Sequence, residues 1–502
     1  MFKKVLIANR GEIALRIIRA CRELGVASVA VYSDADARAP HVREADEAVN
    51  IGAPPSAESY LRGERIIEAA RRLGAEAIHP GYGFLSEREW FARAVRDAGL
   101  VFIGPPAEAI AAMGSKTAAR TLAVAANVPV VPGTTEPLKD AAEARTVADR
   151  FGYPVLLKAA AGGGGKGMRL VRDASEMESS LDAARRESKN AFGDDAVYVE
   201  KYIVGPRHVE VQVLGDNYGT MLSLNERECS VQRRHQKMIE EAPSVAVTPE
   251  IRRVMGETAV RAASAAGYGH AGTCEFLLDR DGKFYFLEMN TRLQVEHPVT
   301  ELVTGIDLVQ WQMRIASGER LPFKQEDIVP RGWAIECRIT SEDPANGFLP
   351  STGTISYVHV PAGPGVRWDS GIEIGSEVGL YYDPMLAKLI VHAPTREAAV
   401  ERMHRALLEL TIEGVDTSRD FQLRVMEDAD FRSGAIEIQW LERRLDSLTH
   451  AKPPAELTRK AAIIAALIAD RDRLAPARPT SPSSGAPTQD AWTRVARLEN
   501  LR

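Results

Sequence analysis

The chain of 502 residues is too long for a single hydrophobic core and predicts about three domains. Its composition, 45% apolar and 26% charged, is that of an ordinary globular protein, and its net charge of −6 argues against a nucleic-acid-binding protein. The four cysteines are widely spaced and form no CxxC pair, which argues against a disulfide framework and indicates a reducing compartment.

The sequence predicts neither a membrane span nor a signal peptide. The apolar run from Ala461 to Ala469 is too short to cross a bilayer. A second apolar run starts at Val5 and stops at the polar residues Asn9-Arg10-Gly11-Glu12. We therefore interpret this run as the first strand of a cytoplasmic protein.

Residues 1–113 alternate short apolar runs with helical periodicity. The first helix is expected to bury a stripe of residues spaced three or four apart, namely Ile13, Ile17, Cys21 and Leu24. The other predicted elements are strands at 5–8, 29–32, 77–79 and 100–103 and helices at about 66–73 and 91–98. This alternation predicts an α/β domain with a parallel sheet and helices on its faces.

A glycine- and proline-rich motif follows the third of these helix-linked strands: His79-Pro80-Gly81-Tyr82-Gly83. Parallel sheets usually place ligand-binding loops directly after a strand. The motif is thus a candidate ligand loop, and an ordinary turn is an equal alternative.

The middle of the chain changes in pattern. From about 114 to 328, helices alternate with paired strands, which predicts an α+β domain. Within it, residues 132–203 carry their own strands and a glycine run, as a separate subdomain would.

The last third predicts another domain and a tail. Residues 329–446 hold short strands at 334–339 and 354–360 and a helix at 396–410. The tail, 447–502, contains an alanine-rich helix at 457–474, a linker rich in Pro and Ser at 476–489, and an amphipathic end at 491–502.

The glycine run at 162–167 has the form GxGxxG, but its flanks exclude a dinucleotide-binding fingerprint, which must open a helix. Strands are predicted on both sides, at 155–159 and 168–171, so the run joins two antiparallel strands. It is not a P-loop, since Gly167 follows the lysine where Ser or Thr is required. Its N–H groups can wrap phosphates, and Lys158 can add a point charge. A flexible hairpin without a ligand is the alternative.

Segments 275–278 and 284–287 flank the turn-rich residues 279–282 and predict a β-hairpin. Symmetric closure pairs Glu275 with Phe286 and places three oxygen donors on one face: Glu275, Glu288 and Asn290. Such hard ligands suit Mg²⁺ held together with substrate phosphates. A β-bulge would flip part of this set. The alternative is a solvated polar face opposite an apolar face of Phe276, Leu278, Leu287 and Met289.

The next residues, 292–298, continue the alternation. If they are extended, Arg292, Gln294 and Glu296 share a face beside the metal. A guanidinium can grip a small oxyanion there, and a carboxylate can act as a base. Lys237 adds positive charge, which fits electrostatic catalysis of phosphoryl transfer. Taken singly, each of these residues is better explained by a surface ion pair.

Together these motifs resemble one family, biotin carboxylase, an ATP-grasp enzyme. The resemblance runs from residue 1 to about 446. The matching strings are Ala8-Asn9-Arg10-Gly11-Glu12-Ile13-Ala14, His79-Pro80-Gly81-Tyr82-Gly83-Phe84-Leu85-Ser86-Glu87, 158–168, Glu288-Met289-Asn290-Thr291-Arg292-Leu293-Gln294-Val295-Glu296-His297-Pro298, 336–339 and 381–385. The resemblance implies a Rossmann-like N-terminal domain, a central ATP-grasp domain with a glycine-rich lid at about 132–203, and a C-terminal biotin carboxylase domain.

The resemblance also implies roles for single residues. Those implied to bind ATP are Lys116, Lys158, Gly164, Gly165, Glu200, Lys201, Tyr202, Ile203, His208 and His235. Those implied to bind Mg²⁺, or Mn²⁺ in its place, are Glu275, Glu288 and Asn290. Those implied to hold bicarbonate are Lys237, Arg292, Gln294 and Val295, while Glu296 is its base and Arg338 stabilises the biotin enolate.

The implied chemistry has two stages. Bicarbonate, deprotonated by Glu296, attacks the γ-phosphoryl group of ATP and gives carboxyphosphate, which breaks down to CO₂ and phosphate. The biotin enolate then attacks CO₂. Because carboxyphosphate is hydrolytically unstable, a lid that excludes water has a clear purpose.

The sequence contains no Ala-Met-Lys-Met-type biotinyl motif, so the implied partners are a separate biotin carboxyl carrier protein and carboxyltransferase subunits. A homodimer is a family expectation, and residues 491–502 are a candidate docking segment for a partner. Two other functions stay open at this point: another ATP-grasp ligase, such as one joining a carboxylate to an amine, and a nucleotide-binding regulatory module without catalysis.

Overall fold

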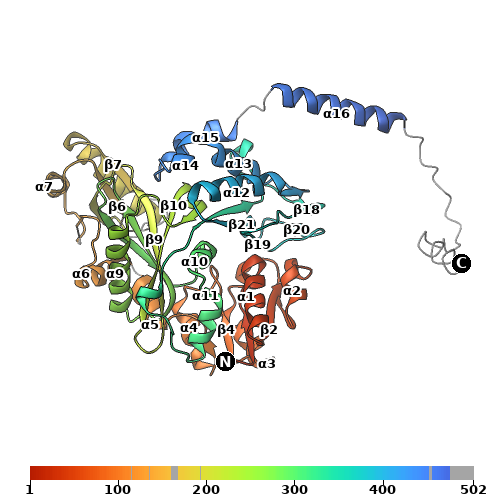
Figure 1. The fold of residues 1–502 in the computed structure, drawn as a ribbon. Coiled ribbons are helices and arrows are strands. Elements are labelled where there is room, and N and C mark those ends of the chain that lie inside the picture. Colours follow the sequence, from red (N-terminus) through yellow and green to blue (C-terminus); the bar gives the residue numbers. More distant parts are fainter. Residues whose placement is uncertain (115, 135, 160–167, 193, 451–454, 475–502) are drawn as a thin grey trace, which may run out of the picture. The chain divides into compact units, whose positions relative to one another are not determined.

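A computed structural model describes residues 1–114, 116–134, 136–159, 168–192, 194–450 and 455–474 (Figure 1). The chain divides into two compact units, Met1–Thr449 and His450–Arg502. The first unit carries the strands and the cavity discussed below, so the second is treated by itself at the end of this subsection.

The N-terminal region forms the predicted parallel α/β sheet. Its strands run in the order β3-β2-β1-β4-β5, and every pair is parallel. The strands are β1 (Lys4–Ile7), β2 (Ala27–Ser33), β3 (Glu47–Gly52), β4 (Ala77–His79) and β5 (Val101–Phe102). The helices are α1 (Gly11–Glu23), α2 (Pro40–Glu44), α3 (Gly63–Arg72), α4 (Glu89–Asp97) and α5 (Ala107–Gly114).

Three of the four predicted stripe residues of α1 are buried, whereas Leu24 follows the last helical residue and is half-buried. Ile13, Ile17 and Cys21 are almost fully buried, and they pack with residues of α11 (Leu308–Ala316) such as Met313. The N-terminal sheet therefore shares a core with a helix some 300 residues later in the chain, which holds the two regions together.

A small antiparallel sheet, in the order β7-β6-β8, lies within residues 132–203. Its strands are β6 (Val155–Ala159), β7 (Met168–Val171) and β8 (Val197–Lys201). The helices of this region are α7 (Ala141–Phe151) and α8 (Met177–Phe192), and α6 (Lys116–Ala125) precedes it. Because β6 and β7 are antiparallel partners, the glycine run joins antiparallel strands as predicted. The run itself, 162–167, lies outside the described residues.

The largest sheet has eight strands, in the order β13-β12-β9-β10-β11-β14-β21-β19, and all its pairs are antiparallel. The strands are β9 (Arg207–Gly215), β10 (Met221–Arg233), β11 (Gln236–Ala242), β12 (His270–Leu278), β13 (Phe284–Asn290), β14 (Trp333–Thr340), β19 (Val366–Ser370) and β21 (Met385–Ala393). Since β11 pairs with β14, the sheet runs across the predicted boundary at 328/329. The domain limits given above remain predictions.

The remaining elements surround this sheet. The helices are α9 (Pro249–Ala265), α10 (His297–Thr304), α12 (Arg396–Glu409), α13 (Arg419–Glu427), α14 (Ala429–Ser433) and α15 (Trp440–Thr449). The short strands are β15 (Glu342–Asp343), β16 (Leu349–Pro350), β17 (Gly353–Thr354), β18 (Tyr357–His359), β20 (Glu377–Val378) and β22 (Thr411–Glu413). The single strand predicted at 354–360 is thus two, because β17 pairs with β20 whereas β18 pairs with β22.

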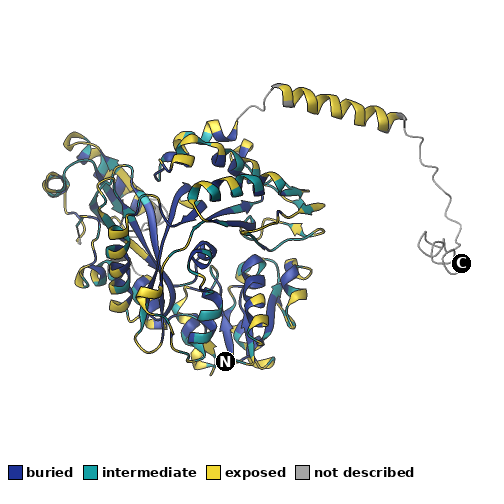
Figure 2. Cartoon of the chain, in the orientation of Figure 1, coloured by how far each residue is buried: buried dark blue, intermediate teal, exposed yellow. Residues whose placement is uncertain are grey.

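Strand β9 buries apolar side chains on one face of the large sheet and polar side chains on the other. It alternates valines with polar residues, and both sets are buried, as the dark strand in Figure 2 shows. Val209, Val211 and Val213 join an apolar core on one face. The other face carries the buried polar side chains of His208 and Glu210, which need polar partners.

The predicted hairpin is present, but its register differs from the prediction. Symmetric closure pairs Glu275 with Phe286, whereas the structure pairs Phe286 with Phe276 and Glu288 with Glu275. A β-bulge between these two pairs leaves Leu287 as the extra residue. Leu287 is accordingly exposed and not part of the apolar face. The bulge preserves the shared face of Glu275 and Glu288, since they are direct cross-strand partners.

Residues 291–296 are not the extended continuation considered above. They form an irregular segment and a turn that leads into α10. Its side chains are brought together by tertiary contacts and not by strand alternation.

In the second unit, the predicted tail helix is confirmed as α16 (Ala455–Leu474). Its apolar side chains Ile463, Ile464, Leu467 and Ile468 are exposed. The predicted linker at 476–489 and the amphipathic end at 491–502 lie outside the described residues. Among the described helices, none combines the length and apolar character that a membrane span requires.

Two buried histidines predict how stability depends on pH. Burial lowers the pKa of His270 to about 4, and burial, His270 and Arg16 lower the pKa of His79 to about 3. The unfolded chain takes up a proton on each histidine as the pH falls below about 6.5, whereas the folded chain does not. Stability should therefore fall as the pH drops from about 6.5 toward 4.

We expect the free energy of unfolding of His270→Asn to fall less steeply as the pH drops, by about the slope that one proton contributes. The measurement is the urea midpoint at a series of pH values. Asparagine suits the position because His270 has a positive φ of 78°. An unchanged slope would show that His270 is not the group that titrates.

Candidate functional site

The first unit contains a cavity of about 1320 Å³. It is lined by the ligand-loop candidate at Tyr82, by the small sheet, and by strands of the large sheet. The predicted site residues that line it are Lys158, Glu200, Lys201, Tyr202, Ile203, His208, His235, Lys237, Glu275, Glu288, Asn290, Arg292, Gln294, Val295, Glu296 and Arg338. Lys116 begins α6, but its side chain lies outside the described residues, as do Gly164 and Gly165.

A row of charged residues crosses four strands on the cavity face of the sheet. Register pairs Glu288 with Glu275, Glu275 with Glu210, and Glu210 with Arg227. Residues opposite each other across strands share a face, so the row is a direct result of the strand order. It places three carboxylates next to one buried guanidinium.

Lys237 lies at the centre of the site. Its ammonium Nζ donates to Glu210 Oε2 at 2.5 Å, to Glu296 Oε1 at 2.7 Å and to Glu275 Oε1 at 2.8 Å. Burial would lower the pKa of Lys237, but these carboxylates raise it well above its usual value. The ammonium is therefore a permanent cation that links three strands to the segment before α10.

Glu296 is held between two cations. Its Oε1 accepts from Lys237, and its Oε2 accepts from Arg338 Nη2 at 2.9 Å. Burial would raise the pKa of Glu296, but Lys237, Arg338 and Arg227 together lower it well below its usual value. In this arrangement Glu296 is a stable carboxylate, and it becomes a stronger base when one of the cations is drawn away.

Arg338 has a second partner on the neighbouring strand. Its Nε donates to Glu240 Oε1 at 2.6 Å. Burial raises the pKa of Glu240 to about 7, although Arg338 lowers it. Arg338 is thus positioned between two glutamates, and it lines the cavity.

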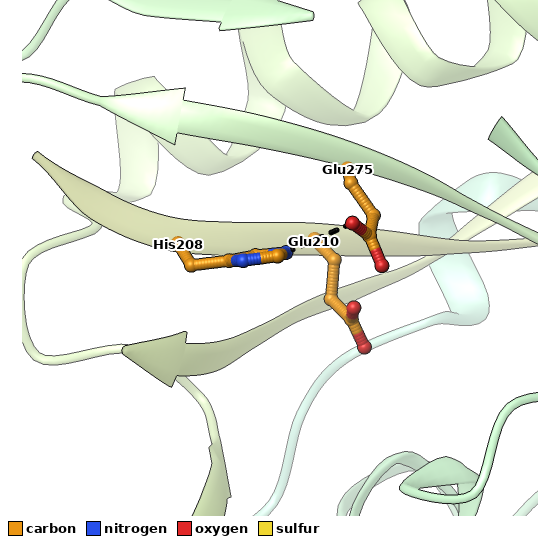
Figure 3. Close-up of side chains that lie close together, drawn as sticks. All are labelled: His208, Glu210 and Glu275. Carbon is orange, nitrogen blue, oxygen red and sulfur yellow. Dashed lines mark ion pairs between the residues drawn. The ribbon is translucent and has the colours of Figure 1, made fainter. Parts of the chain in front are cut away.

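The hairpin residues provide oxygen donors for a cation. Glu275 and Glu288 are cross-strand partners, and Asn290 Nδ2 donates to Glu275 Oε1 at 2.9 Å. His208 Nε2 lies 3.1 Å from Glu275 Oε2, and Figure 3 shows the ring directed toward that carboxylate. His208 and Lys237 lower the pKa of Glu275 well below its usual value in spite of its burial.

A second donor set overlaps the first. His208, Glu210 and Glu275 offer ligand atoms that all lie within 4.8 Å of one another. Glu210, however, already accepts from Arg227 Nε at 2.5 Å and from Lys237. Glu210 is also absent from the cavity lining, whereas Glu275, Glu288 and Asn290 all line it, so we favour these three as donors for a hard cation such as Mg²⁺.

The segment 291–296 is fixed by Glu87, the last residue of the matching string 79–87. Glu87 Oε1 accepts from the Thr291 N–H at 3.1 Å, and Oε2 accepts from Arg292 Nε at 2.8 Å. Arg292 Nη2 also donates to Asn290 Oδ1 at 3.2 Å. Arg292 is thus next to the donor set, as the sequence predicts, but it is oriented by a residue 205 positions earlier.

The part of the cavity next to the small sheet is partly apolar. Lys158 contacts the carboxylate of Glu200, and Lys201 Nζ donates to the carbonyl of Gly152 at 2.7 Å. The apolar lining there includes Val131, Leu156, Met168, Ile203, Leu277 and Ile438. Apolar walls beside the polar strand end at Glu200 and Lys201 can hold a flat heteroaromatic ring.

His235 is at the tip of the β10–β11 hairpin. Arg234 and His235 form its two-residue turn, with φ angles of 49° and 66°. This left-handed conformation is unusual for residues other than glycine, and strained residues of this kind cluster at functional sites. His235 is exposed and lines the cavity.

The sequence analysis missed four residues that organise the site: Glu87, Glu210, Arg227 and Glu240. Glu210 had a signal, because it alternates with buried valines in β9. Arg227 had a weaker one, as an arginine inside a long strand. Glu240 had none, since its partner Arg338 is distant in sequence. Glu87 ended a matching string, but no role was assigned to it.

Family models match most of the chain. One described as the N-terminal domain of biotin carboxylase matches residues 1–110, and one described as the biotin carboxylase C-terminal domain matches residues 336–443. Between them, a model described as the ATP-binding domain of the carbamoyl-phosphate synthase L chain matches residues 115–324.

Curated relatives and solved structures agree with these matches. Haemophilus influenzae biotin carboxylase is 52% identical over 446 residues, covering 89% of this chain and 99% of that protein. The 2-oxoglutarate carboxylase small subunit of Hydrogenobacter thermophilus is 52% identical over 442 residues, covering 88% and 93%. The biotin carboxylase domain dimer of that organism's 2-oxoglutarate carboxylase, solved with MgADP, ADP and bicarbonate, is 51% identical, with a TM-score of 0.83 and coverage of 90% and 100%.

Removing the buried guanidinium of Arg227 should destabilise the protein. Arg227 is fully buried and donates to Glu210, Gln212, Thr273 and Thr300. Arg227→Met leaves a buried carboxylate with one cation fewer, and we expect a loss of about 3–5 kcal/mol in the free energy of unfolding. Arg253→Met on the exposed face of α9 is the matched control and should change little. Equal effects of the two variants in urea unfolding would contradict this account.

Proposed function

This chain belongs to the biotin carboxylase family, and we propose that it uses ATP, Mg²⁺ and bicarbonate to carboxylate biotin on a separate carrier protein. The observation that carries the proposal is the contact of both Lys237 and Arg338 with Glu296 inside one cavity. This arrangement provides two cations and one carboxylate at the place where a small anion would be activated. A solved relative bound to bicarbonate supports the same assignment.

ATP would lie along the cavity, with its adenine between the apolar walls near Ile203 and its phosphates near Lys158. Glu200, Lys201 and Tyr202 would form the hinge that borders the base. Lys116, Gly164, Gly165, His208 and His235 complete the proposed nucleotide set, of which Lys116 and the two glycines are assigned from sequence alone.

Glu275, Glu288 and Asn290 would hold Mg²⁺. Their oxygen donors fit this hard cation, because two of them are cross-strand partners and the third is hydrogen-bonded to the first. When bound, the cation would neutralise charge on the ATP phosphates during phosphoryl transfer.

Bicarbonate would lie among Lys237, Arg292, Gln294 and the main chain of Val295. A bound anion would draw the cations toward itself, which raises the pKa of Glu296 and makes it a better base. Glu296 would then accept the bicarbonate proton, and the resulting oxygen would attack the γ-phosphoryl group to form carboxyphosphate. Carboxyphosphate would break down to CO₂ and phosphate within the cavity.

In the second stage, Arg338 would stabilise the enolate of biotin as it attacks CO₂. Its guanidinium suits this role because it borders the cavity and is held in place by Glu240. The residual phosphate would take up the biotin N1′ proton.

We further propose that the chain works in the cytoplasm as a homodimer with a carrier protein and carboxyltransferase subunits. Relatives near 50% identity carry the names of 2-oxoglutarate, pyruvate and methylcrotonoyl-CoA carboxylases. Because chains this similar belong to carboxylases named for such different acceptors, we propose that the carboxyltransferase selects the acceptor.

The central prediction concerns coupling to bicarbonate and biotin. ATP hydrolysis should depend on bicarbonate and increase when free biotin is added. Arg338→Ala should abolish the stimulation by biotin, because it removes the cation that stabilises the enolate. Absence of biotin stimulation in the native protein, together with unchanged activity in Arg338→Ala, would overturn the proposed function.

A second prediction separates catalysis from nucleotide binding. Glu296→Ala should lower turnover by at least about a hundredfold, the usual contribution of a general base. Its affinity for ATP, measured by calorimetry, should stay close to that of the native protein, because Glu296 contacts cations on the acceptor side. Loss of ATP affinity would contradict the base role.

A further inference from the structure

A buried lysine outside the proposed catalytic set contacts the acceptor side of the site. Lys388 on β21 is opposite Arg338 on β14 and opposite Asp369 on β19, so the three form a row across the sheet. Its side chain is completely buried. Its ammonium Nζ donates to the main-chain carbonyl of Val295 at 2.8 Å.

Lys388 is charged in this setting. Burial would lower its pKa, but Glu12, Glu336 and Asp369 raise it above the usual value. The nearest carboxylate oxygen, Glu12 Oε1 of α1, is 3.3 Å from Nζ. The hydrogen bond to Val295 therefore comes from a charged donor, the stronger kind.

The segment that Lys388 contacts has no regular secondary structure to define its path. Glu87 holds its beginning at Thr291, and the ring of His297 contacts the Gln294 carbonyl at 2.8 Å. Lys388 supplies the contact at Val295, immediately before the proposed base. The peptide group held by Lys388 joins Val295 directly to Glu296.

We propose that Lys388 is a positioning residue for bicarbonate activation: it fixes the Val295–Glu296 peptide group and thereby the side chains of Gln294 and Glu296 around Lys237. The inference rests on the proposed function and extends it to a residue of the C-terminal region. Both side chains reach Lys237, at 3.3 Å and 2.7 Å, so a rotated peptide group would disturb both contacts.

Charge neutralisation alone is the competing explanation, since Lys388 is close to buried carboxylates. The double variant Glu12→Gln/Lys388→Met separates the two explanations because it removes one charge of each sign. Glu12→Gln alone keeps the hydrogen bond to Val295 and is the matched control. The assay is bicarbonate-dependent ATP hydrolysis without biotin. Biotin is left out because Glu12 also accepts a hydrogen bond from Tyr82 at the cavity wall, and an effect of Glu12→Gln on that wall must not be confused with an effect on biotin.

We expect the double variant to raise the KM for bicarbonate about tenfold relative to the control, the effect of losing one hydrogen bond from a charged donor. The KM for ATP should stay within about twofold, since the nucleotide end of the cavity is untouched. A bicarbonate KM equal to that of the control would overturn the inference while leaving the proposed function intact. A native protein without bicarbonate-dependent hydrolysis would overturn both.

If circular dichroism shows that the double variant does not fold, Lys388→Arg provides the test. It keeps the charge but replaces the compact ammonium with a larger planar group that displaces the donor from the Val295 carbonyl. We expect a raised bicarbonate KM with an unchanged ATP KM. Native values for both constants would overturn the positioning role.

Discussion

The ammonium of Lys237, held by three carboxylates from three parts of the chain, is the interaction on which the rest of the site depends. Glu210 and Glu275 belong to adjacent strands, and Glu296 belongs to the irregular segment before α10. Buried carboxylates at such close range repel one another unless a cation lies between them. Lys237 therefore makes the arrangement possible, and it also lowers the pKa of Glu296, so that a bound anion can tune the base by competing for the same cation.

The large antiparallel sheet provides the framework for these charges. Its strands place the proposed metal donors, Lys237 and Arg338 on one continuous sheet, although they come from regions that the sequence divides into two domains. Valines on the opposite face of β9 supply the apolar core that offsets the cost of burying the polar face. The N-terminal region and the C-terminal strands then reach the same irregular segment from two sides, through Glu87 and Lys388.

Several features of the fold could be predicted from the sequence because they depend on residues that are close together in the chain. The helix stripe of α1, the antiparallel strands around the glycine run and the acidic hairpin all follow from periodicity and turn residues within short windows. The predicted hairpin register was wrong because the turn takes up one residue more than expected, so that Leu278 pairs with Phe284 and not with Lys283. The shared face of Glu275 and Glu288 still held, because the bulge adds one residue between the two pairs and restores direct opposition.

The sequence by itself determined the kinds of groups in the site: a glycine run between strands, oxygen donors on a hairpin, and a segment after it that carries Arg292, Gln294 and Glu296. Only the tertiary structure decided how they meet. The irregular segment at 291–296 is positioned by Glu87, His297 and Lys388, and Arg338 is oriented by Glu240. Apart from His297, these partners are distant in sequence or lie on a neighbouring strand. Their contacts arise from strand order and domain packing, and both are properties of the whole folded chain.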